Sequence, residues 1–399
     1  MTASSLSNNV LMVTRENAAD RRYGLGRSLM PVVAALQHKG WRVRYLCQQD
    51  MRDATREKRL AWLARLARLP GLSGKPGRQL LLGALLERLH MGWFAAHMAK
   101  KELFTAVHLH DPWLAAGFWL GLKAQRLAGI RWGITEHGFG CYSHATHEDG
   151  LYQGPAVQRW LRRAEAAILN QADWVTAPTQ LALQQVARDL ALVRTPARWV
   201  CIPHVPMAIA PISPTNRAEA RLKLGWLANE QVVLGIGRLV PLKQFDLLVA
   251  VCAGLAVRYP GLRLQLLGEG ESHLLQAIAD RAGFGSRLRF AVTDDVQTYL
   301  QAADIYVSTS KTESFGLANL EAMTAGLPCI CTAVGGVPEV MGTGAWLVPL
   351  EHDSLALALD ALLSNPEQRH QLAERACQQS AKKPSLDAVT QAYAAIYQS

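Results

Sequence analysis

Apolar residues along the chain gather into short runs, separated by longer segments in which they recur every three or four positions. Short runs rich in β-branched residues are typical of strands buried on both faces of a parallel sheet. In the first half of the chain these runs lie within residues 9–14, 40–46, 107–111, 129–138, 172–178 and 199–203. In the second half they lie within residues 231–237, 262–270, 288–292, 304–310, 328–332 and 345–349.

The segments between the runs have the spacing of helices. Residues 27–39, for example, carry Leu29, Val32, Val33 and Leu36 at positions that fall on one helix face. Strands and helices that alternate in this way predict an α/β protein, in which helices cover both faces of parallel sheets.

Prolines gather between Pro206 and Pro214, where the pattern is interrupted. A length of 399 residues is enough for two domains with separate cores. Asn216 followed by Glu219 has the pattern of a capping box, which predicts the start of the helix after this linker. We predict a first domain at 1–205, a linker with the following helix at 206–228, a second domain at 229–384 and a C-terminal helix at 385–399.

Composition narrows the class of protein. Hydrophobic residues make up 50% of the chain and charged residues 19%, which is typical of a globular protein. There is no uncharged apolar run of the length that a membrane span needs, and the N-terminus lacks the pattern of a secretory signal. The seven cysteines are scattered and mostly in apolar surroundings, so we expect them to be reduced and the protein to be cytoplasmic.

The net charge of +10 is concentrated near the N-terminus. Residues 55–69 have the pattern of a basic amphipathic helix, with Trp62 among its apolar residues. Ordinary helices covering a sheet, an anionic membrane surface and an anionic substrate remain open as explanations. Nucleic acid is excluded as a partner because no nucleic-acid motif or stacking platform accompanies the charge. Eight basic residues contribute, against Asp53 and Glu57: Arg52, Arg56, Lys58, Arg59, Arg65, Arg68, Lys75 and Arg78.

Residues 311–328 carry the strongest candidate chemistry. Glu313 and Glu321 lie eight positions apart, after the apolar run at 304–310 and on either side of Gly316. This places them where a strand ends and a helix begins, the edge at which parallel sheets bind ligands. The amides of Gly316 and Leu317 at the helix start suit a phosphate, and the carboxylates suit sugar hydroxyls.

A second candidate follows the run at 231–237. Arg238 comes directly after Gly237, and Lys243 lies five residues further on. An arginine that can bind phosphate oxygens through two N–H groups, with a second cation nearby, predicts a site for a diphosphate.

These stretches closely resemble the E-x7-E signature of family-4 retaining glycosyltransferases, also described as glycosyl transferases group 1. The resemblance covers nearly the whole chain, strongly at 235–349 and weakly before residue 129. It implies the GT-B fold, with two Rossmann-like domains whose parallel sheets face a central cleft. It also implies that the last helix packs back on the first domain.

The resemblance further implies roles for individual residues. Glu313 holds the donor sugar, Glu321 holds the ribose, and Arg238 and Lys243 hold the diphosphate. His137, within Thr135–Gly138, is a catalytic residue of the donor site, and His110 and Asp111 lie on the acceptor side. His204 departs from the family, which usually carries Asn-Gly-Val-Asp there. The remaining donor contacts are Gly24, Gly26, Gly237, Gly268, Val292, Ser314, Phe315, Gly316 and Leu317.

The expected reaction is transfer of a sugar from a nucleotide-sugar, by default a UDP-sugar, to a hydroxyl of a glycan or lipid-linked acceptor in surface polysaccharide or lipopolysaccharide biosynthesis. No Asp-x-Asp occurs, and the histidines between His137 and His147 fit no common zinc spacing, so we expect neither a metal nor a cofactor. A nucleotide-sugar epimerase of this architecture and a catalytically silent nucleotide- or lipid-binding protein are the alternatives. An oxidoreductase is disfavoured because no dinucleotide fingerprint is complete.

Overall fold

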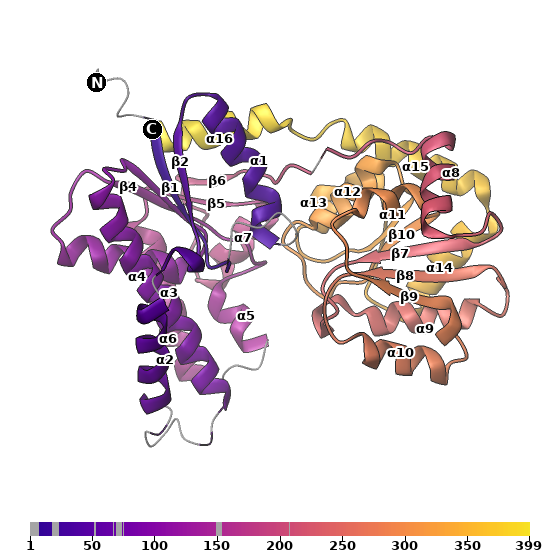
Figure 1. Ribbon diagram of the computed structural model, residues 1–399, viewed down its shortest axis with the longest axis horizontal. Helices are drawn as coiled ribbons and strands as arrows, with labels where there is room; N and C mark the ends of the chain where they lie inside the picture. The colour runs from indigo at the N-terminus through magenta and orange to yellow at the C-terminus, as the bar shows by residue number, and fades with distance from the viewer. Residues whose placement is uncertain are drawn as a thin grey trace. The chain divides into compact units, whose positions relative to one another are not determined.

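The computed structural model describes residues 8–17, 24–51, 53–66, 68, 74, 76–148, 154–206 and 208–399. The chain divides into two compact units (Figure 1). Unit 1 contains residues 1–205 together with 384–399, and unit 2 contains residues 206–383.

Unit 1 is built on a six-stranded sheet in the order β2-β1-β3-β4-β5-β6, and every pair of neighbours is parallel. The order reverses between β1 and β3, so the connections from these strands leave a crevice at their carboxyl ends. The strands are β1 Asn9–Val13, β2 Arg42–Leu46, β3 Ala106–Leu109, β4 Arg131–Thr135, β5 Trp174–Ala177 and β6 Trp199–Cys201.

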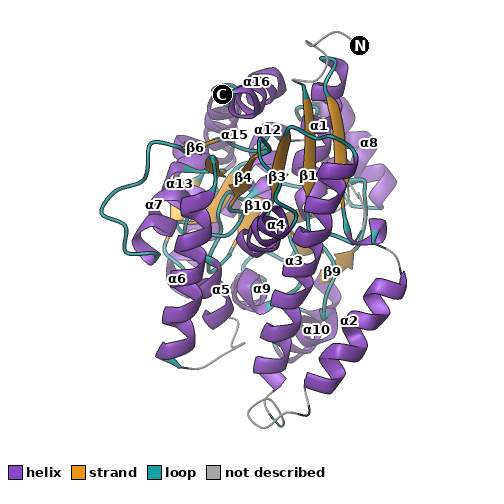
Figure 2. Cartoon of the chain, turned by 90° about the vertical axis from the view of Figure 1, so that its left-hand side faces the viewer, coloured by secondary structure: helices purple, strands orange, loops and turns teal. Residues whose placement is uncertain are grey.

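Helices cover both faces of this sheet. One core includes side chains of α3 and α4, and the other includes side chains of α1 and of the C-terminal helix α16. Figure 2, which faces unit 1, shows α3 and α6 as long helices that extend beyond the strands. The helices of unit 1 are α1 Gly24–His38, α2 Asp53–Leu66, α3 Pro76–Lys101, α4 Pro112–Ala124, α5 Tyr142–Glu148, α6 Pro155–Gln171, α7 Gln180–Asp189 and α16 Leu386–Gln398, with a short 3-10 helix η2 Gln48–Asp50.

Unit 2 repeats the same plan. Its six parallel strands have the order β12-β11-β10-β7-β8-β9, with an apolar core on each face. The strands are β7 Gln231–Ile236, β8 Leu262–Leu267, β9 Leu288–Ala291, β10 Ile305–Ser308, β11 Cys329–Thr332 and β12 Trp346–Val348. The helices are α8 Pro214–Leu224, α9 Phe245–Leu255, α10 Ser272–Arg281, α11 Val296–Ala302, α12 Leu317–Ala325, α13 Val337–Met341, α14 His352–Ser364 and α15 Pro366–Ser380, with 3-10 helices η3 Pro241–Lys243, η4 Gly285–Arg287 and η5 Gly342–Gly344.

The prediction of an α/β protein with two parallel, helix-covered sheets is confirmed. Two predicted helix starts were wrong. α1 begins at Gly24 rather than near residue 27, so Gly24 and Gly26 lie in its first turn and not in a loop before it. α8 begins at Pro214 because Ser213, not Asn216, is its N-cap: the Ser213 hydroxyl accepts from the Asn216 amide, and the Asn216 side chain accepts from the Ser213 amide.

The basic segment is described only in part. Arg52 and Lys75 lie outside the described residues, while Arg65, Arg68 and Arg78 are exposed. None of the described helices is long and apolar enough to cross a membrane.

Candidate functional site

The centre of the candidate site in unit 2 is an ion pair between two predicted residues. Lys243, at the end of η3, places its Nζ 2.6 Å from Oε2 of Glu313 and 3.4 Å from the Ser310 hydroxyl. Both charged side chains keep about a fifth of their surface exposed, 23% for Lys243 and 20% for Glu313. The Thr309 hydroxyl donates to the main-chain oxygen of Lys243 and so fixes η3 to the end of β10. The pair is therefore positioned by two strand ends and is open to a ligand.

Two glycines bring the neighbouring strand ends into contact. Gly237 and Gly268 follow β7 and β8 with φ of 155° and 144°, which other residues rarely adopt. A Cβ on Gly268 would lie 2.0 Å from the Gly237 carbonyl oxygen, so no side chain fits there. Arg238 comes next in the chain and is exposed. The exposed Arg238 and the stem of Lys243 both lie beside Gly237.

The loop before α12 is held by a second pair of glycines. Gly336 donates its amide to the carbonyl oxygen of Glu313 at 2.8 Å, and a Cβ on Gly335 would lie 2.0 Å from the same oxygen. Gly316 adopts a left-handed conformation as the N-cap of α12, with φ of 79°. The first amides of α12, beginning at Leu317, therefore lie beside the Glu313 loop, at the positive end of the helix.

Glu321 lies one turn inside α12 and is fully buried. Nearby, the buried Tyr306 hydroxyl donates to Oδ1 of Asn319 at 2.8 Å. Burial raises the pKa of Tyr306 well above its ordinary value, and the thiols of Cys331 and Cys329, followed by Glu313 and Glu321, raise it further. Of the two glutamates, only Glu313 is partly exposed.

Unit 2 brings most predicted donor residues together at the carboxyl ends of β7, β8 and β10. Phe315 is buried, while Ser314 is only partly buried. Val292 follows β9 and is 60% exposed. The other predicted residues, namely Gly24, Gly26, His110, Asp111 and His137, belong to unit 1.

In unit 1 the two predicted histidines are in contact. His110 follows β3 and is buried, and His137 follows β4 and is half-buried. Nδ1 of His110 lies 3.0 Å from Nε2 of His137. Burial lowers the pKa of both imidazoles well below 6.5, and neighbouring histidines lower it further. Both rings are therefore neutral near pH 7.

Asp111 already has partners for both oxygens within unit 1. Its Oδ1 accepts from the amides of Trp113 and Leu114 and caps α4, and its Oδ2 accepts from Nε of Arg88 at 2.8 Å. Less than a tenth of either side chain in this ion pair is exposed. The acceptor-side prediction consequently rests on His110, and Asp111 has a structural role.

The predicted phosphate contact at Gly24 and Gly26 has an occupant from the chain itself. Oε1 of Glu16 accepts from the amides of Leu25 at 2.8 Å and Gly26 at 3.2 Å, and its Oε2 accepts from the Tyr45 hydroxyl. A carboxylate at a helix start satisfies the same donors that a phosphate would use. An anion could bind these amides only if Glu16 moved away.

Several buried polar residues near the histidines were not predicted. His108 bonds the Tyr397 hydroxyl at 2.7 Å and the Thr135 hydroxyl at 2.6 Å. The His204 ring lies parallel to that of His137. Glu165 is fully buried and has a pKa raised to about 8, mainly by desolvation. His108 lies in β3, Glu165 in α6 and His204 after β6. Isolated polar residues follow no periodicity, so the sequence carried no signal for these contacts.

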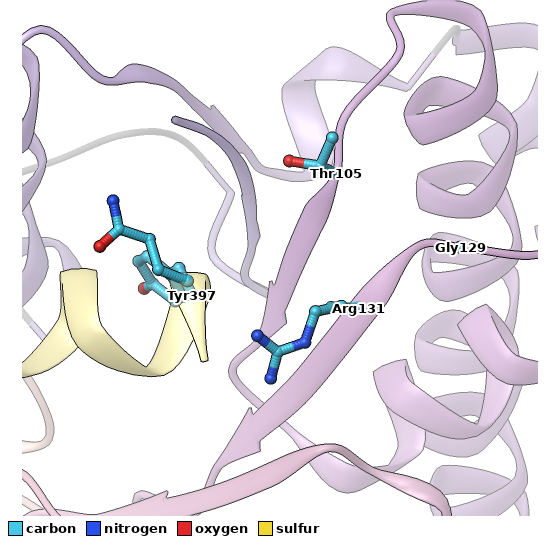
Figure 3. A pocket seen from close by; sticks show the side chains of 5 residues that line it. Thr105, Gly129, Arg131 and Tyr397 are labelled. Atoms are coloured by element: carbon cyan, nitrogen blue, oxygen red, sulfur yellow. The ribbon is translucent and has the colours of Figure 1, made fainter. Parts of the chain in front are cut away.

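A pocket of about 410 Å³ lies elsewhere on unit 1 (Figure 3). Thr105 and Arg131 stand at the amino ends of β3 and β4, the opposite edge of the sheet from His110 and His137. This pocket is therefore separate from the candidate site. Its lining residues are Thr105, Gly129, Arg131, Tyr397 and Gln398. Among the residues described in both units, no three His, Cys, Asp or Glu side chains are grouped to hold a metal ion.

Comparison with known proteins identifies the family. Residues 216–379 match the family model described as glycosyl transferases group 1, and residues 23–205 match a glycosyl transferase 4-like domain. D-inositol 3-phosphate glycosyltransferase of Mycobacterium avium is 30% identical over 76% of this chain and 73% of its own length. The enzyme of the same name from Mycobacteroides abscessus is 32% identical over 59% of this chain, and the match spans about half, 52%, of that relative.

Solved structures share the fold. Sucrose-phosphate synthase from Thermosynechococcus elongatus has a TM-score of 0.75 at 20% identity and covers 98% of both chains. WaaG, a glycosyltransferase involved in lipopolysaccharide biosynthesis, has a TM-score of 0.70 at 20% identity and covers 97% of this chain and 99% of its own. Anabaena HepE in complex with UDP-glucose has a TM-score of 0.73 at 18% identity, covering 97% of this chain and 98% of its own.

The chain belongs to the glycosyl transferases group 1 family, and its fold is GT-B.

Proposed function

We propose that this protein is a retaining glycosyltransferase that moves a sugar from a nucleotide-sugar to a hydroxyl acceptor. The observation that carries the proposal is the partly exposed Lys243–Glu313 pair, with the stem of Lys243 against Gly237 at the end of β7. A cation and a carboxylate side by side offer separate partners to a diphosphate and to the hydroxyls of the attached sugar.

In the proposed reaction, Lys243 exchanges Glu313 for a phosphate oxygen when the donor binds. Lys243, Arg238 and the first amides of α12 then stabilise the charge that develops on the leaving diphosphate. The bond between the anomeric carbon and the phosphate oxygen breaks with its electron pair on that oxygen. The acceptor oxygen bonds to the same face of the carbon, and its proton passes to the leaving phosphate, which accounts for retention. The donor needs neither a metal nor a cofactor in this scheme.

The donor is proposed to be a UDP-sugar, and the acceptor a glycan or a lipid-linked sugar of a surface polysaccharide or lipopolysaccharide. HepE binds UDP-glucose, and WaaG is involved in lipopolysaccharide biosynthesis, which supports this choice by analogy. The mycobacterial relatives are named D-inositol 3-phosphate glycosyltransferases. The net charge of +10 favours an anionic acceptor.

Donor and site can be tested together with a panel of UDP-, GDP-, ADP- and TDP-sugars. Thermal shift and slow hydrolysis are measured for the wild type, for Glu321→Ala and for Glu367→Ala, a control on the exposed surface of α15. We expect one sugar nucleotide to stabilise the wild type and be hydrolysed, with both effects weakened only by Glu321→Ala. A response to none of them would favour a silent binding protein, and conversion of the donor to an epimer without acceptor would favour an epimerase.

The role of Arg238 can be separated from general effects of charge. Arg238→Ala should lower turnover by about two orders of magnitude, the usual effect of removing one group that stabilises transition-state charge. Arg258→Ala is the control, because Arg258 forms an exposed ion pair with Asp360 in the same unit. Equal loss of turnover in both variants would contradict the assignment.

We also propose that the basic segment at 52–78 contacts an anionic membrane surface from the cytoplasmic side. Trp62 on α2 is 52% exposed, Leu80 on α3 is 63% exposed, and Arg65 and Arg68 are exposed as well. Indole rings and basic side chains are the groups that favour a lipid interface. None of the seven cysteines, all of which lie among the described residues, forms a disulfide, which fits a reducing compartment.

Sedimentation with phospholipid vesicles tests the membrane contact. The protein should sediment with vesicles that contain anionic lipid and not with zwitterionic ones, and the double variant Arg65→Gln, Arg68→Gln should lose this binding. The same pair of changes at Arg258 and Arg281, both exposed on unit 2, is the control. Binding that is independent of lipid charge would rule the contact out.

A further inference from the structure

His204, which the sequence left without a role, lies against a predicted catalytic residue. The ring of His204 is stacked parallel to that of His137, with centroids 5.7 Å apart and an angle of 4° between the planes. His204 follows β6, whose exit is fixed by a hydrogen bond from the Ile202 amide to the carbonyl oxygen of Ala177. The stack therefore joins the carboxyl ends of two strands, β4 and β6, that are not neighbours in the sheet.

His110 holds the same ring by a different contact. Its Nδ1 lies 3.0 Å from Nε2 of His137, and the two rings are 5.2 Å apart at an angle of 30°. His110 is itself fixed, because its amide donates to the carbonyl oxygen of Val13 and its ring packs 4.2 Å from that of the buried His108. One neighbour thus bonds His137 through a nitrogen, and the other stacks on its face.

The hydrogen bond links the tautomers of the two rings. A neutral imidazole carries one N–H and one bare nitrogen. If Nδ1 of His110 donates, Nε2 of His137 accepts and His137 must carry its proton on Nδ1. If Nε2 of His137 donates instead, its Nδ1 carries no proton. In either arrangement one proton lies between the rings, so the partner decides whether Nδ1 of His137 offers a donor or an acceptor.

We propose that His110 and His204 are positioning residues for His137, which together fix the plane of its ring and the state of the nitrogen that it presents to a hydroxyl of a sugar substrate. This proposal rests on the proposed glycosyl transfer for its substrate, but not for the geometry it describes. A neutral ring suits a hydroxyl, which both donates and accepts, better than a phosphate, which needs a cation or a donor only.

Burial favours the neutral form of the His137 and His204 rings. Desolvation is the main cause of the lowered pKa of His137, and His110, His204 and Arg15 lower it further. Desolvation brings the pKa of His204 to about 4. Removing the His204 ring admits water to His137, so the pKa of His137 should rise towards its ordinary value of about 6.5.

Two variants of His204, compared with a control variant, test the proposal by kinetics. His204→Ala should lower kcat on the order of tenfold, as a misplaced group does, with little change in the KM for the nucleotide-sugar. Its acid limb in the pH–kcat profile should move to higher pH. His204→Phe restores a stacking ring and should recover most of the lost kcat. His370→Ala, on the exposed surface of α15, is the control and should match the wild type in both measurements.

Spectroscopy tests the geometry without any turnover. Long-range proton–nitrogen spectra of the imidazoles, assigned by comparison with His137→Gln, report the tautomer of His137. The wild type should show a single tautomer at pH 7, and His110→Phe should give the other tautomer or a mixture. An unchanged His137 signal in both His110→Phe and His204→Ala would overturn the proposal. If no sugar nucleotide is turned over but the spectra change as expected, the proposed function fails and the positioning holds.

Discussion

Gly268 shows how a single position decides whether the donor site can form. Its φ of 144° is outside the range of other residues, and a Cβ there would overlap the carbonyl oxygen of Gly237 at 2.0 Å. We expect Gly268→Ala to destabilise unit 2 by about 2 to 4 kcal/mol, from backbone strain and overpacking together. Urea unfolding monitored by circular dichroism measures this change.

Gly254 provides the matched control for this substitution. It lies in α9, and no atom approaches within 4 Å of the position that its Cβ would take. Gly254→Ala should leave stability unchanged or raise it by up to about 1 kcal/mol, because alanine favours a helix. If the two variants unfold at the same urea concentration, the close approach of Gly268 to the Gly237 carbonyl oxygen does not contribute to stability.

At the scale of single residues, the sequence predicted where charged side chains lie better than it predicted how exposed they are. Arg238, Lys243 and Glu313 follow strands that could be located from their apolar runs, so their meeting at one sheet edge could be foreseen. Burial of the Glu321 carboxylate could not be foreseen, because it depends on the strand and loop that pack over α12. The same holds for Asp111, whose partner Arg88 comes from a helix with no sequence relation to it.

Among the elements, α5 depends on one side chain of another helix. Oε1 of Glu165, on α6, accepts from the Tyr142 amide at 2.7 Å, and Oε2 accepts from the Ser143 amide at 3.3 Å. These two amides begin α5, and helix starts need such acceptors. Glu165 thus fixes α5 to α6, and desolvation nevertheless raises its pKa to about 8 because it is fully buried.

This raised pKa makes a contribution to stability that falls with increasing pH. Between about pH 4.5, the ordinary pKa, and pH 8, the folded protein holds a proton on Glu165 that the unfolded chain releases. The contribution is full below this window and is lost as the pH rises through it. The thermal midpoint of unit 1 should therefore depend less on pH, between 5 and 8.5, in Glu165→Gln than in the wild type.

Tryptophan fluorescence follows unit 1 in this experiment, because nine of the eleven tryptophans lie in residues 1–205. Glu367→Gln, on the exposed surface of α15, is the control and should keep the pH dependence of the wild type. A Glu165→Gln profile parallel to that of the wild type would show that another group titrates in this window.

Strands and helices could be predicted from the sequence where a single physical rule determines their positions. The strands are apolar because both faces of the sheets are covered, and this gave their positions within a few residues. The start of α1 was not predictable, because it depends on Glu16 reaching the amides of Leu25 and Gly26. The start of α8 was misplaced because Ser213 competed with Asn216 for the cap, and local patterns allow both.

At the scale of the whole molecule, unit 1 is closed by residues from the far end of the chain. Val389, Tyr393 and Tyr397 of α16 are buried in the same core as Val10 of β1 and residues of α1. The Tyr397 hydroxyl also bonds the buried His108 at 2.7 Å. Unit 2, in contrast, is formed by one continuous stretch.

Because the units have separate cores, we expect changes in α16 to act on unit 1 alone. Tyr397→Phe removes a buried hydrogen bond and leaves a nitrogen of His108 without its partner, which should cost unit 1 about 1 to 3 kcal/mol. Tyr259→Phe is the matched control, since its hydroxyl bonds Asp360 at the surface of unit 2, and it should cost less than about 1 kcal/mol. Calorimetry with parallel tryptophan fluorescence should place the Tyr397→Phe loss of stability in the fluorescence-detected transition.

A chain that ends at Lys383 should lower the midpoint temperature of the same transition further, since it exposes the apolar core that α16 covers. A fall in the other transition alone would mean that α16 supports unit 2 instead, against the contacts that it makes.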